Sequence, residues 1–301
     1  MSTLRDLSIF THAILNESIF SSPSAVREWL QPRSFAGSSY SFVGAPWEIY
    51  QPPIEGDQVL TPEHPHTITI FAKGGAAYGY NSQIALIPQY GIALTLLTAG
   101  DQSALFFLYD ALLSTLIPAV DKAAREEAET NGFVGTFASS ASACGATTGL
   151  SSGQDVCTNA SFALDDDSLI MSSLSRNGSD ILEAFATIWS LTVGSVIPPL
   201  ENSSLRLFPT ELPPVHGKLA DNRDVVHEDW RMTWSVGLSS DTELPHKGFP
   251  RRDCLTWAFS DWLYYGGEPI DRIVFVRDPA TGEVLGVEVP FLRSGFLARD
   301  A

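Results

Sequence analysis

The stretch that decides the fold is His66-Thr-Ile-Thr-Ile-Phe-Ala-Lys73-Gly74-Gly75-Ala76-Ala-Tyr78-Gly-Tyr-Asn-Ser82. Its first part, Thr67 to Ala72, alternates in the way that is typical of a half-buried β-strand. Two further apolar segments follow, Gln83 to Ile87 and Ile92 to Thr98, with a tight-turn sequence between them, Pro88-Gln-Tyr-Gly91. The pattern predicts three consecutive antiparallel strands, with Lys73 at the end of the first.

Lys73-Gly74-Gly75 combines residue types that can build one wall of a reactive site. A lysine can place a point charge beside an anionic group of a ligand. The two glycines let a bound molecule approach the backbone, so that the N–H of Ala76 can donate to a developing oxyanion. Taken alone, however, a Lys-Gly-Gly at a strand end is more often a simple turn than a site, so its context has to decide.

The segments on either side of these strands predict helices. Met1 to about Leu30 has a helical pattern, with Ser22 as N-cap and Pro23 at the first position of a turn. After the strands, a long helix is expected from about Ser103 to Glu129. Its apolar part is interrupted by Asp110 and Pro118, so we expect a buried helix rather than a membrane span.

The character of the sequence changes after Asn131-Gly132. Short alternating runs recur between turn signals, with one further helix expected around Asp180 to Leu191. This spacing is typical of an all-β barrel or sandwich. The fold class is therefore α+β, with a first domain over residues 1–131 and a β-rich accessory domain over residues 132–301.

Several segments together carry a resemblance to a known family. They are the run from His66 to Gly100, Trp29-Leu-Gln-Pro32, Gly44-Ala-Pro-Trp47-Glu48, Arg206 to Thr210, Cys254 to Trp257 and Tyr264 to Phe275. The first three resemble the last sheet strands, and the segments before them, of the serine β-lactamase and penicillin-binding-protein-like family, especially its fungal members. The last three resemble the β domain that such proteins append. The resemblance implies a partial β-lactamase/transpeptidase-like domain, of antiparallel strands and helices, followed by the β domain.

The resemblance also implies roles for individual residues. Lys73, Gly75 and the N–H of Ala76 correspond to catalytic positions, and Gly74 and Tyr78 to the substrate-binding wall. Gly74 departs from the pattern, because the family has a hydroxyl residue there that helps to bind a substrate carboxylate. The expected activity is therefore an esterase-like hydrolase or acyltransferase on a neutral ester, amide or acyl small molecule, with a role in fungal secondary metabolism as a further implication.

The family's nucleophile lies in a Ser-x-x-Lys motif, which this sequence lacks. Its four lysines, Lys73, Lys122, Lys218 and Lys247, follow Ile70, Ala119, Val215 and Leu244 at that spacing. We expect the motif to precede Met1, which would make the chain a shortened hydrolase whose exposed sheet is covered by a complementing chain. The alternative is a non-catalytic pseudoenzyme that serves as a binding or scaffold protein.

Composition limits the partners. The formal net charge of −17 repels phosphate backbones and anionic lipid, so neither nucleic acid nor a membrane is expected as a partner. No cofactor and no metal are expected, since His64-Pro-His66 has no evident third ligand. Gly149-Leu-Ser-Ser-Gly153 matches a nucleophile elbow only formally, because no strand and helix are expected around it.

Localisation is left open by the sequence. Cys144 and Cys157 flank a Gly/Ser/Thr-rich segment and either pair or remain free, like Cys254. Four of the seven asparagines lie in glycosylation sequons, at positions 16, 159, 177 and 202, which favours a secretory origin. The N-terminus carries no signal peptide, so we expect any such leader to belong to a preceding segment.

Overall fold

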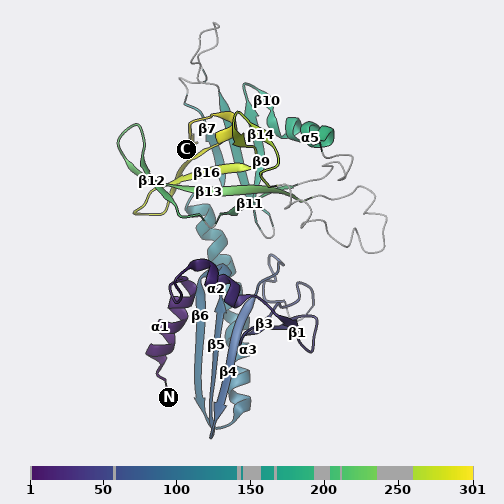
Figure 1. Ribbon diagram of the computed structural model, residues 1–301, viewed down its shortest axis with the longest axis vertical. Helices are drawn as coiled ribbons and strands as arrows, with labels where there is room; N and C mark the ends of the chain where they lie inside the picture. The colour runs from purple at the N-terminus through teal and green to yellow at the C-terminus, as the bar shows by residue number, and fades with distance from the viewer. Residues whose placement is uncertain are drawn as a thin grey trace. The chain divides into compact units, whose positions relative to one another are not determined.

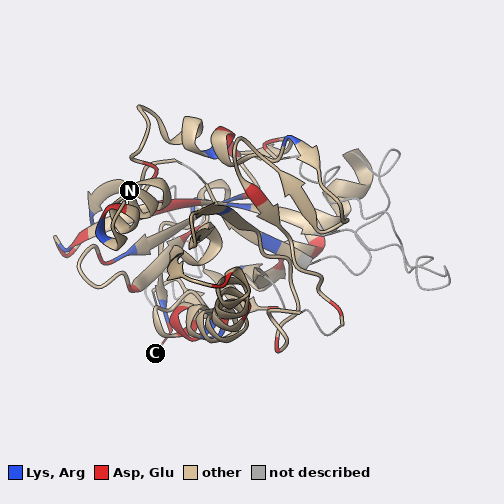
Figure 2. Cartoon of the chain, turned by 90° about the horizontal axis from the view of Figure 1, so that it is seen from below, with Lys and Arg blue, Asp and Glu red and all other residues tan. Residues whose placement is uncertain are grey.

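In a computed structural model, the described residues are 2–56, 59–140, 144, 157–165, 168–192, 204–210, 212–235 and 260–300. They form two compact units, Met1–Arg125 and Glu126–Ala301 (Figure 1). The boundary expected near residue 131 coincides with the end of helix α3, Gln102–Thr130. The boundary between the two compact units lies a few residues earlier, within this helix, between Arg125 and Glu126. Acidic and basic residues are scattered along the chain rather than gathered in one patch of the ribbon (Figure 2).

The first unit contains a six-stranded antiparallel sheet with its strands in chain order. Its strands are β1 Ser34–Phe35, β2 Ser41–Val43, β3 Glu48–Tyr50, β4 Ile70–Ala77, β5 Tyr80–Ile87 and β6 Ile92–Ala99. The last three are the strands predicted from sequence, and Gly91 closes the turn η1, Pro88–Tyr90, in the left-handed conformation with φ of 64°. The first three are too short to show a periodicity.

Helices cover both faces of this sheet. On one face, α1 (Leu4–Leu15) and α2 (Pro23–Leu30) contribute Ile14 and Val26 to a core with Trp47, Ile49 and Leu86. On the other, α3 packs its Ile117 against Ile70 and Ala72 of β4. The predicted helical region divides into two helices, and Ser22 caps the second, which begins at Pro23, as predicted: its hydroxyl accepts from the N–H of Ala25 at 3.3 Å.

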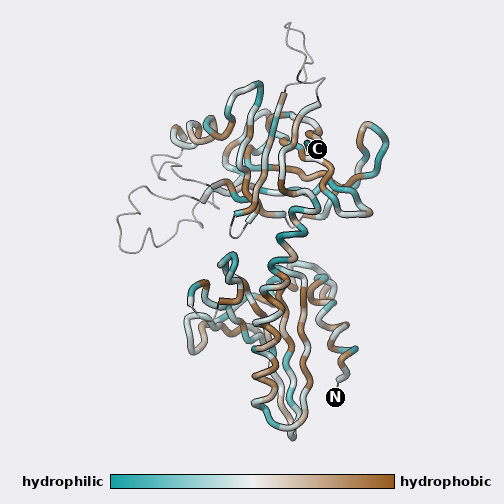
Figure 3. Tube along the Cα trace, turned by 180° about the vertical axis from the view of Figure 1, so that it is seen from behind, coloured by the Kyte–Doolittle hydropathy of each residue, from teal (hydrophilic) through white to brown (hydrophobic). Residues whose placement is uncertain are grey.

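Helix α3 is largely exposed, so the expectation of a buried helix is wrong. By length and composition it could cross a membrane, with a mean hydropathy of 1.7 over its most apolar window, and only 11% of that window is buried. Its first part is apolar and its C-terminal end hydrophilic (Figure 3). Phe106 and Phe107 are 53% and 73% exposed. Periodicity detects apolar residues but not what covers them.

The second unit is a closed β-barrel, which confirms the barrel alternative. Around the barrel the strands are β9 Leu169–Arg176, β11 Ser204–Pro209, β13 Asp224–Ser235, β16 Arg272–Arg277, β17 Val284–Glu288, β18 Phe296–Arg299, β7 Gly135–Ala138 and β8 Thr158–Leu164. The pairing of β8 with β9 closes the ring. The smaller elements are β10 Ser179–Asp180, β12 Val215–Lys218, β14 Tyr264–Tyr265, β15 Glu268–Pro269, the turn η3 Pro290–Leu292 and helix α5 Ile181–Thr192, which fits the helix expected near residues 180–191.

Aromatic side chains fill the core of the barrel. Phe275 contacts the rings of Phe133, Phe162 and Trp230 at centroid distances of 5.1, 5.2 and 5.3 Å. Edge-to-face and tilted contacts of this kind stabilise a core beyond the area that they bury. Cys144 and Cys157, whose pairing the sequence left open, are joined by a disulfide.

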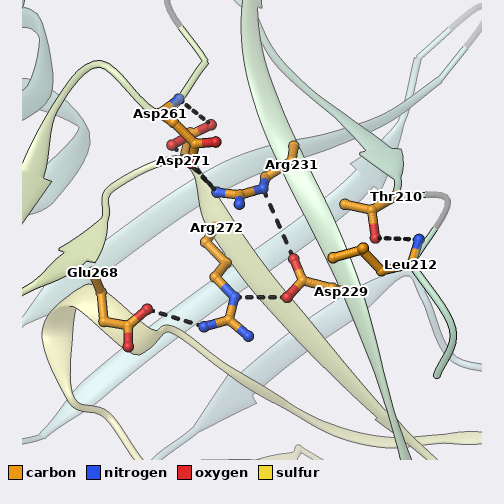
Figure 4. Close-up of polar contacts among 8 residues, drawn as sticks. All are labelled: Thr210, Leu212, Asp229, Arg231, Asp261, Glu268, Asp271 and Arg272. Atoms are coloured by element: carbon orange, nitrogen blue, oxygen red, sulfur yellow. Dashed lines mark hydrogen bonds and ion pairs between the residues drawn. The ribbon is translucent and has the colours of Figure 1, made fainter. Parts of the chain in front are cut away.

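A chain of ion pairs links β13 to β16 (Figure 4). Asp229 accepts from Arg272 at 2.7 Å and lies 3.9 Å from Arg231, which also reaches Asp271 at 3.7 Å. The Asp271 carboxyl group is 2% exposed and accepts the backbone N–H of Asp261 at 3.3 Å. Burial raises the pKa of Asp271 above its ordinary value, and this outweighs the opposite effects of the Asp261 N–H and Arg231.

We expect Gly286→Ala to destabilise the barrel, because the new Cβ would meet the ring of Phe296 and the backbone carbonyl oxygen of Leu297. Overpacking of this kind costs about 1–3 kcal/mol. Urea unfolding followed by tryptophan fluorescence measures the loss. Gly37→Ala is the control, because a Cβ there meets nothing within 4 Å. Equal stability of both variants would contradict the close packing of β17 on β18.

Asp271 should give the stability of the barrel a specific pH dependence. The pKa of Asp271 is raised on folding, so the folded state holds this proton more tightly than the unfolded chain does. As the pH rises from the unfolded pKa of 3.8 towards the higher folded pKa, the contribution of this group to the free energy of unfolding therefore falls. Urea unfolding from about pH 4 to about pH 7 should show this decline in the wild type and not in Asp271→Asn. Asp224→Asn is the control, since Lys218 lowers the pKa of Asp224 and its contribution has the opposite sign. A decline that survives in Asp271→Asn would assign it to another group.

Candidate functional site

Lys73 lies inside strand β4, not at its end as the sequence analysis expected. The strand continues to Ala77 because its hairpin with β5 extends to the pair Ala77 and Tyr80. Pairing with β3, by contrast, stops at Glu48 and Ala72. From Lys73 onward, β4 is therefore paired with a strand on one side only, as far as the structure describes the chain.

The backbone groups of Gly74 and Ala76 face the unpaired side of β4. The N–H of Gly74 donates to Oε2 of Glu48 at 3.2 Å, on the side of β3, whereas the carbonyl oxygen of Gly75 accepts from the hydroxyl of Ser82 at 3.2 Å, on the side of β5. Successive residues of a strand direct their N–H and C=O groups to opposite sides. The N–H of Ala76 therefore points to the same open edge as that of Gly74, where a substrate oxygen could accept it.

The ammonium group of Lys73 lies at this edge, held by two acceptors. Its Nζ donates to Oε1 of Glu48 at 2.6 Å and to the carbonyl oxygen of Gly74 at 2.8 Å. Its side chain is 39% exposed, so the group remains accessible to solvent. Glu48 thus bonds both the cation and the neighbouring N–H, at the last pair of the β3–β4 ladder.

The space beside Gly74 is occupied by polar side chains. A Cβ at Gly74 would lie 2.9 Å from Oε1 of Gln83 and 3.6 Å from Oε2 of Glu48. A Cβ at Gly75 would lie 2.9 Å from the hydroxyl oxygen of Ser82. An amide and a carboxylate therefore stand next to the position where the resemblance leads one to expect a hydroxyl residue.

Tyr78, the other expected substrate-binding residue, lies away from this group. It occupies the β4–β5 turn with Gly79, has φ of 50° and is fully exposed. At about 3.3 Å per residue, it is roughly 16 Å along the strand from Lys73. The structure thus brings Lys73, Gly74, Gly75 and Ala76 together along one edge and leaves Tyr78 at the tip of the hairpin.

Glu48 and Gln83 were not predicted as site residues from the sequence. The available signal was the alternation around Glu48: Trp47 and Ile49 are buried on the α1–α2 face, so Glu48 must project to the opposite face. Gln83 could only be found from the register, since it pairs with Gly74 across the hairpin.

His66 has a structural role. Its Nδ1 lies 2.6 Å from the carbonyl oxygen of His64 and its Nε2 lies 3.0 Å from the hydroxyl of Tyr90, which donates to Asp121 at 2.9 Å. In the part of the chain that the structure describes, no group of three metal-ligating side chains is found. The Gly149–Gly153 motif lies outside the described residues.

The fold and the edge of β4 define a class of protein. An antiparallel sheet with helices on both faces, a Lys-Gly-Gly on a strand with an open edge and a following β-barrel are the features expected of a β-lactamase-like protein with an appended β domain. The family model described as "Beta-lactamase-like-like, C-terminal domain" matches residues 124–300. The chain belongs to this family.

Three curated fungal proteins are similar to the chain over nearly all of its length. A "Beta-lactamase-like protein" of Arthroderma benhamiae is 38% identical, over 99% of this chain and 48% of its own length. "Probable hydrolase M10" of a Phoma species and "Probable hydrolase clz13" of Cochliobolus lunatus are each 28% identical over 95% of this chain, and 43% and 41% of their lengths are covered. The chain thus spans about half the length, or less, of these relatives.

A solved structure, that of the octameric penicillin-binding protein homologue from Pyrococcus abyssi, overlaps with 77% of the chain and 45% of its own chain at 14% identity. The TM-score is 0.28, which is too low to support an argument about fold or function.

Glu48→Gln should make Lys73 more reactive, because it removes the carboxylate that holds the ammonium group. An ion pair as exposed as this one contributes about 0.2–1 kcal/mol, which corresponds to a roughly 1.4- to 5-fold faster acylation of Lys73. Limited labelling with an amine-acylating reagent, followed by peptide mass spectrometry, measures the rate. Lys218, paired with Asp224 at 2.6 Å in the other unit, is the internal control and should label at an unchanged rate. An unchanged rate at Lys73 would show that the pair with Glu48 does not persist.

Proposed function

We propose that this chain supplies one wall of an acyl-transfer site, in a serine hydrolase or acyltransferase acting on a small ester, amide or acyl substrate. One observation carries the proposal: the N–H of Ala76 and the ammonium group of Lys73 lie along the same unpaired strand edge. A backbone N–H and a cation held at an edge that admits an extended ligand can stabilise the negative charge that develops in acyl transfer. The names of the two probable hydrolases support this proposal.

The nucleophile has to come from outside the sequence, which contains no Ser-x-x-Lys. An acyl-enzyme cannot form without it, whatever donors are present. We therefore propose that a complementing segment or chain brings the serine to the open edge of β4, and that Lys73, Gly75 and Ala76 become catalytic and Gly74 substrate-binding in that assembly. Tyr78, at the hairpin tip, would contact substrate only if the ligand extended that far.

Two exposed surfaces of the first unit support the need for a complementing segment. Strand β6 is at the end of the sheet and pairs only with β5 among the described strands. An unpaired eight-residue edge is a template for a further strand. Helix α3 exposes Phe106 and Phe107, which an isolated soluble domain would normally cover.

The substrate that fits this wall is neutral at the position next to Gly74. Glu48 and Gln83 line that position in place of a hydroxyl side chain, and a substrate carboxylate there would be repelled by Glu48. We therefore propose ester or amide hydrolysis rather than hydrolysis of a carboxylate-bearing β-lactam. The extension to fungal secondary metabolism rests on the family resemblance alone.

A secretory location is consistent with several features. Cys144 and Cys157 form a disulfide, which persists mainly in oxidising compartments. The sequon asparagines Asn16 and Asn177 are exposed, whereas Asn202 lies outside the described residues.

Complementation tests the proposal. The chain is co-expressed with the part of the Arthroderma benhamiae relative that it does not match, and hydrolysis of a neutral p-nitrophenyl ester and of the carboxylate-bearing β-lactam nitrocefin is measured. We expect ester hydrolysis only in the mixture. Lys73→Ala should lower kcat/KM roughly 100-fold or more, the cost of removing one electrostatic stabiliser. Lys218→Ala is the control.

Ala76→Pro sharpens the test, because it removes the N–H on the free edge while the hydrogen bonds to β5 remain. We expect a similar loss of rate with unchanged unfolding. Full activity of Lys73→Ala and Ala76→Pro would refute the assigned roles. The second candidate function is a non-catalytic binding or scaffold protein, and the observation that favours it is the absence of a Ser-x-x-Lys motif. This candidate would be supported if the mixture has no activity while the chain alone unfolds cooperatively.

A further inference from the structure

The first unit contains a cavity of about 900 Å³, within the size range of small-molecule sites. It lies on the α3 face of the sheet, and its walls come from three parts of the unit. Residues between 38 and 62 form one side, β4 and β5 contribute Ile70 and Gln83, and α3 contributes residues between Phe106 and Pro118.

Aromatic rings line this cavity from two sides. Tyr40 and Tyr50 come from the segment that includes β2 and β3, and Phe106 and Tyr109 come from α3. Three of them, Tyr40, Tyr50 and Phe106, are between 41% and 53% exposed, and Tyr40 and Tyr50 lie outside the α3 surface that a complementing segment would cover, so their rings are available to a ligand. The hydroxyl of Tyr109 is buried and has no hydrogen-bond partner among the described residues.

The charges that line the cavity are all negative. Glu48 and Asp110 are its ionisable acids, and none of the residues that line it is a lysine, arginine or histidine. Lys73 compensates part of the charge of Glu48, through the 2.6 Å pair at the strand edge. Asp110 has no ion pair within the described ranges, so its charge is not compensated.

The pKa of the Tyr109 hydroxyl is affected by the same acidic side chains. Burial raises the pKa of its hydroxyl, and Tyr50, Asp110 and Glu48 raise the pKa further. Two carboxylates therefore act on a group in the wall of the cavity, and both would favour a positive charge there.

We propose that this cavity binds an organic ammonium cation, a primary to quaternary amine carried on a small molecule. The ring faces attract a cation through their quadrupoles, the combination used in aromatic cages for quaternary ammonium groups. Asp110 and Glu48 add Coulomb attraction at the rim. The chain binds such a ligand whether or not it takes part in catalysis, so this inference does not depend on the proposed function.

Glu48 and Gln83 also stand beside Gly74, so the cavity borders the open edge of β4. If the proposed function holds, the cavity selects substrates with an ammonium group next to the acyl group that reacts. Only this connection rests on the proposed function.

Binding of a matched set of three ligands to the 301-residue chain tests the proposal. Choline carries the cation, 3,3-dimethylbutan-1-ol is its neutral isostere of the same shape, and 3,3-dimethylbutanoate is an anionic analogue. We expect choline to bind at least about 10-fold more tightly than the neutral isostere, and the anion to bind most weakly. Isothermal titration calorimetry measures all three without an enzymatic readout, so an inactive chain does not affect the result.

Variants locate the site. Asp110→Asn and Tyr50→Leu should each weaken choline binding about 5- to 10-fold. Glu28→Gln is the matched control, because Glu28 is an exposed acid on α2, outside the cavity. Equal binding of choline and its neutral isostere would overturn the proposal in favour of a merely apolar site. The proposal would also be overturned if Glu28→Gln weakened choline binding as much as Asp110→Asn does, or if the wild-type chain bound no choline at about 10 mM.

Discussion

The carboxylate of Glu48 is the constraint on which the candidate site depends. It lies at the last pair of the β3–β4 ladder, where it accepts from both the Lys73 ammonium group and the Gly74 N–H. A strand that loses its neighbour normally exposes a row of unsatisfied backbone groups. Here the Glu48 side chain takes the place of the missing strand at Gly74 only. The ammonium group of Lys73 is thereby held in place, and the N–H of Ala76 has no partner among the described residues. The position of this single carboxylate thus converts a strand edge into a candidate binding surface.

The two units differ in how completely they satisfy their own backbone. In the second unit, β8 pairs with both β7 and β9, the ring of strands is closed and a single hydrophobic core of aliphatic and aromatic side chains fills it. Closure removes sheet edges altogether. In the first unit the sheet is open at β6, and α3 buries few of its apolar residues. Among the described residues, the barrel therefore has no free edge in its ring of strands, whereas the sheet of the first unit ends at β6 without a further strand.

Local signals in the sequence were sufficient where the structure is locally determined. The alternation before Lys73, the turn at Gly91 and the cap at Ser22 predicted β4 to β6 and the start of α2, because each depends on residues a few positions apart. Strands β1 to β3 escaped prediction because two or three residues carry no period. The exposure of α3 and the approach of Glu48 to Lys73 depend on which distant segments pack together, and for Glu48 and Lys73 the separation is 25 residues. Lys73, Gly74, Gly75 and Ala76 could be proposed from sequence because they are consecutive in the chain, but Glu48, which positions Lys73, could not.

Charge then limits what the site can recognise. A hydrolase that binds carboxylate-bearing substrates needs an uncompensated cation near the reacting group, whereas Gln83 and Glu48 stand beside Gly74 and Asp110 lines the cavity that Glu48 and Gln83 also line. Lys73 is the nearest cation, and its charge is largely engaged by Glu48 at 2.6 Å. A carboxylate would have to displace Glu48 from Lys73 and approach Asp110 as well, whereas a neutral ester loses nothing and an ammonium group gains from both acids. If the proposed function holds, selection against anionic substrates would follow from the same carboxylate that holds the lysine in place.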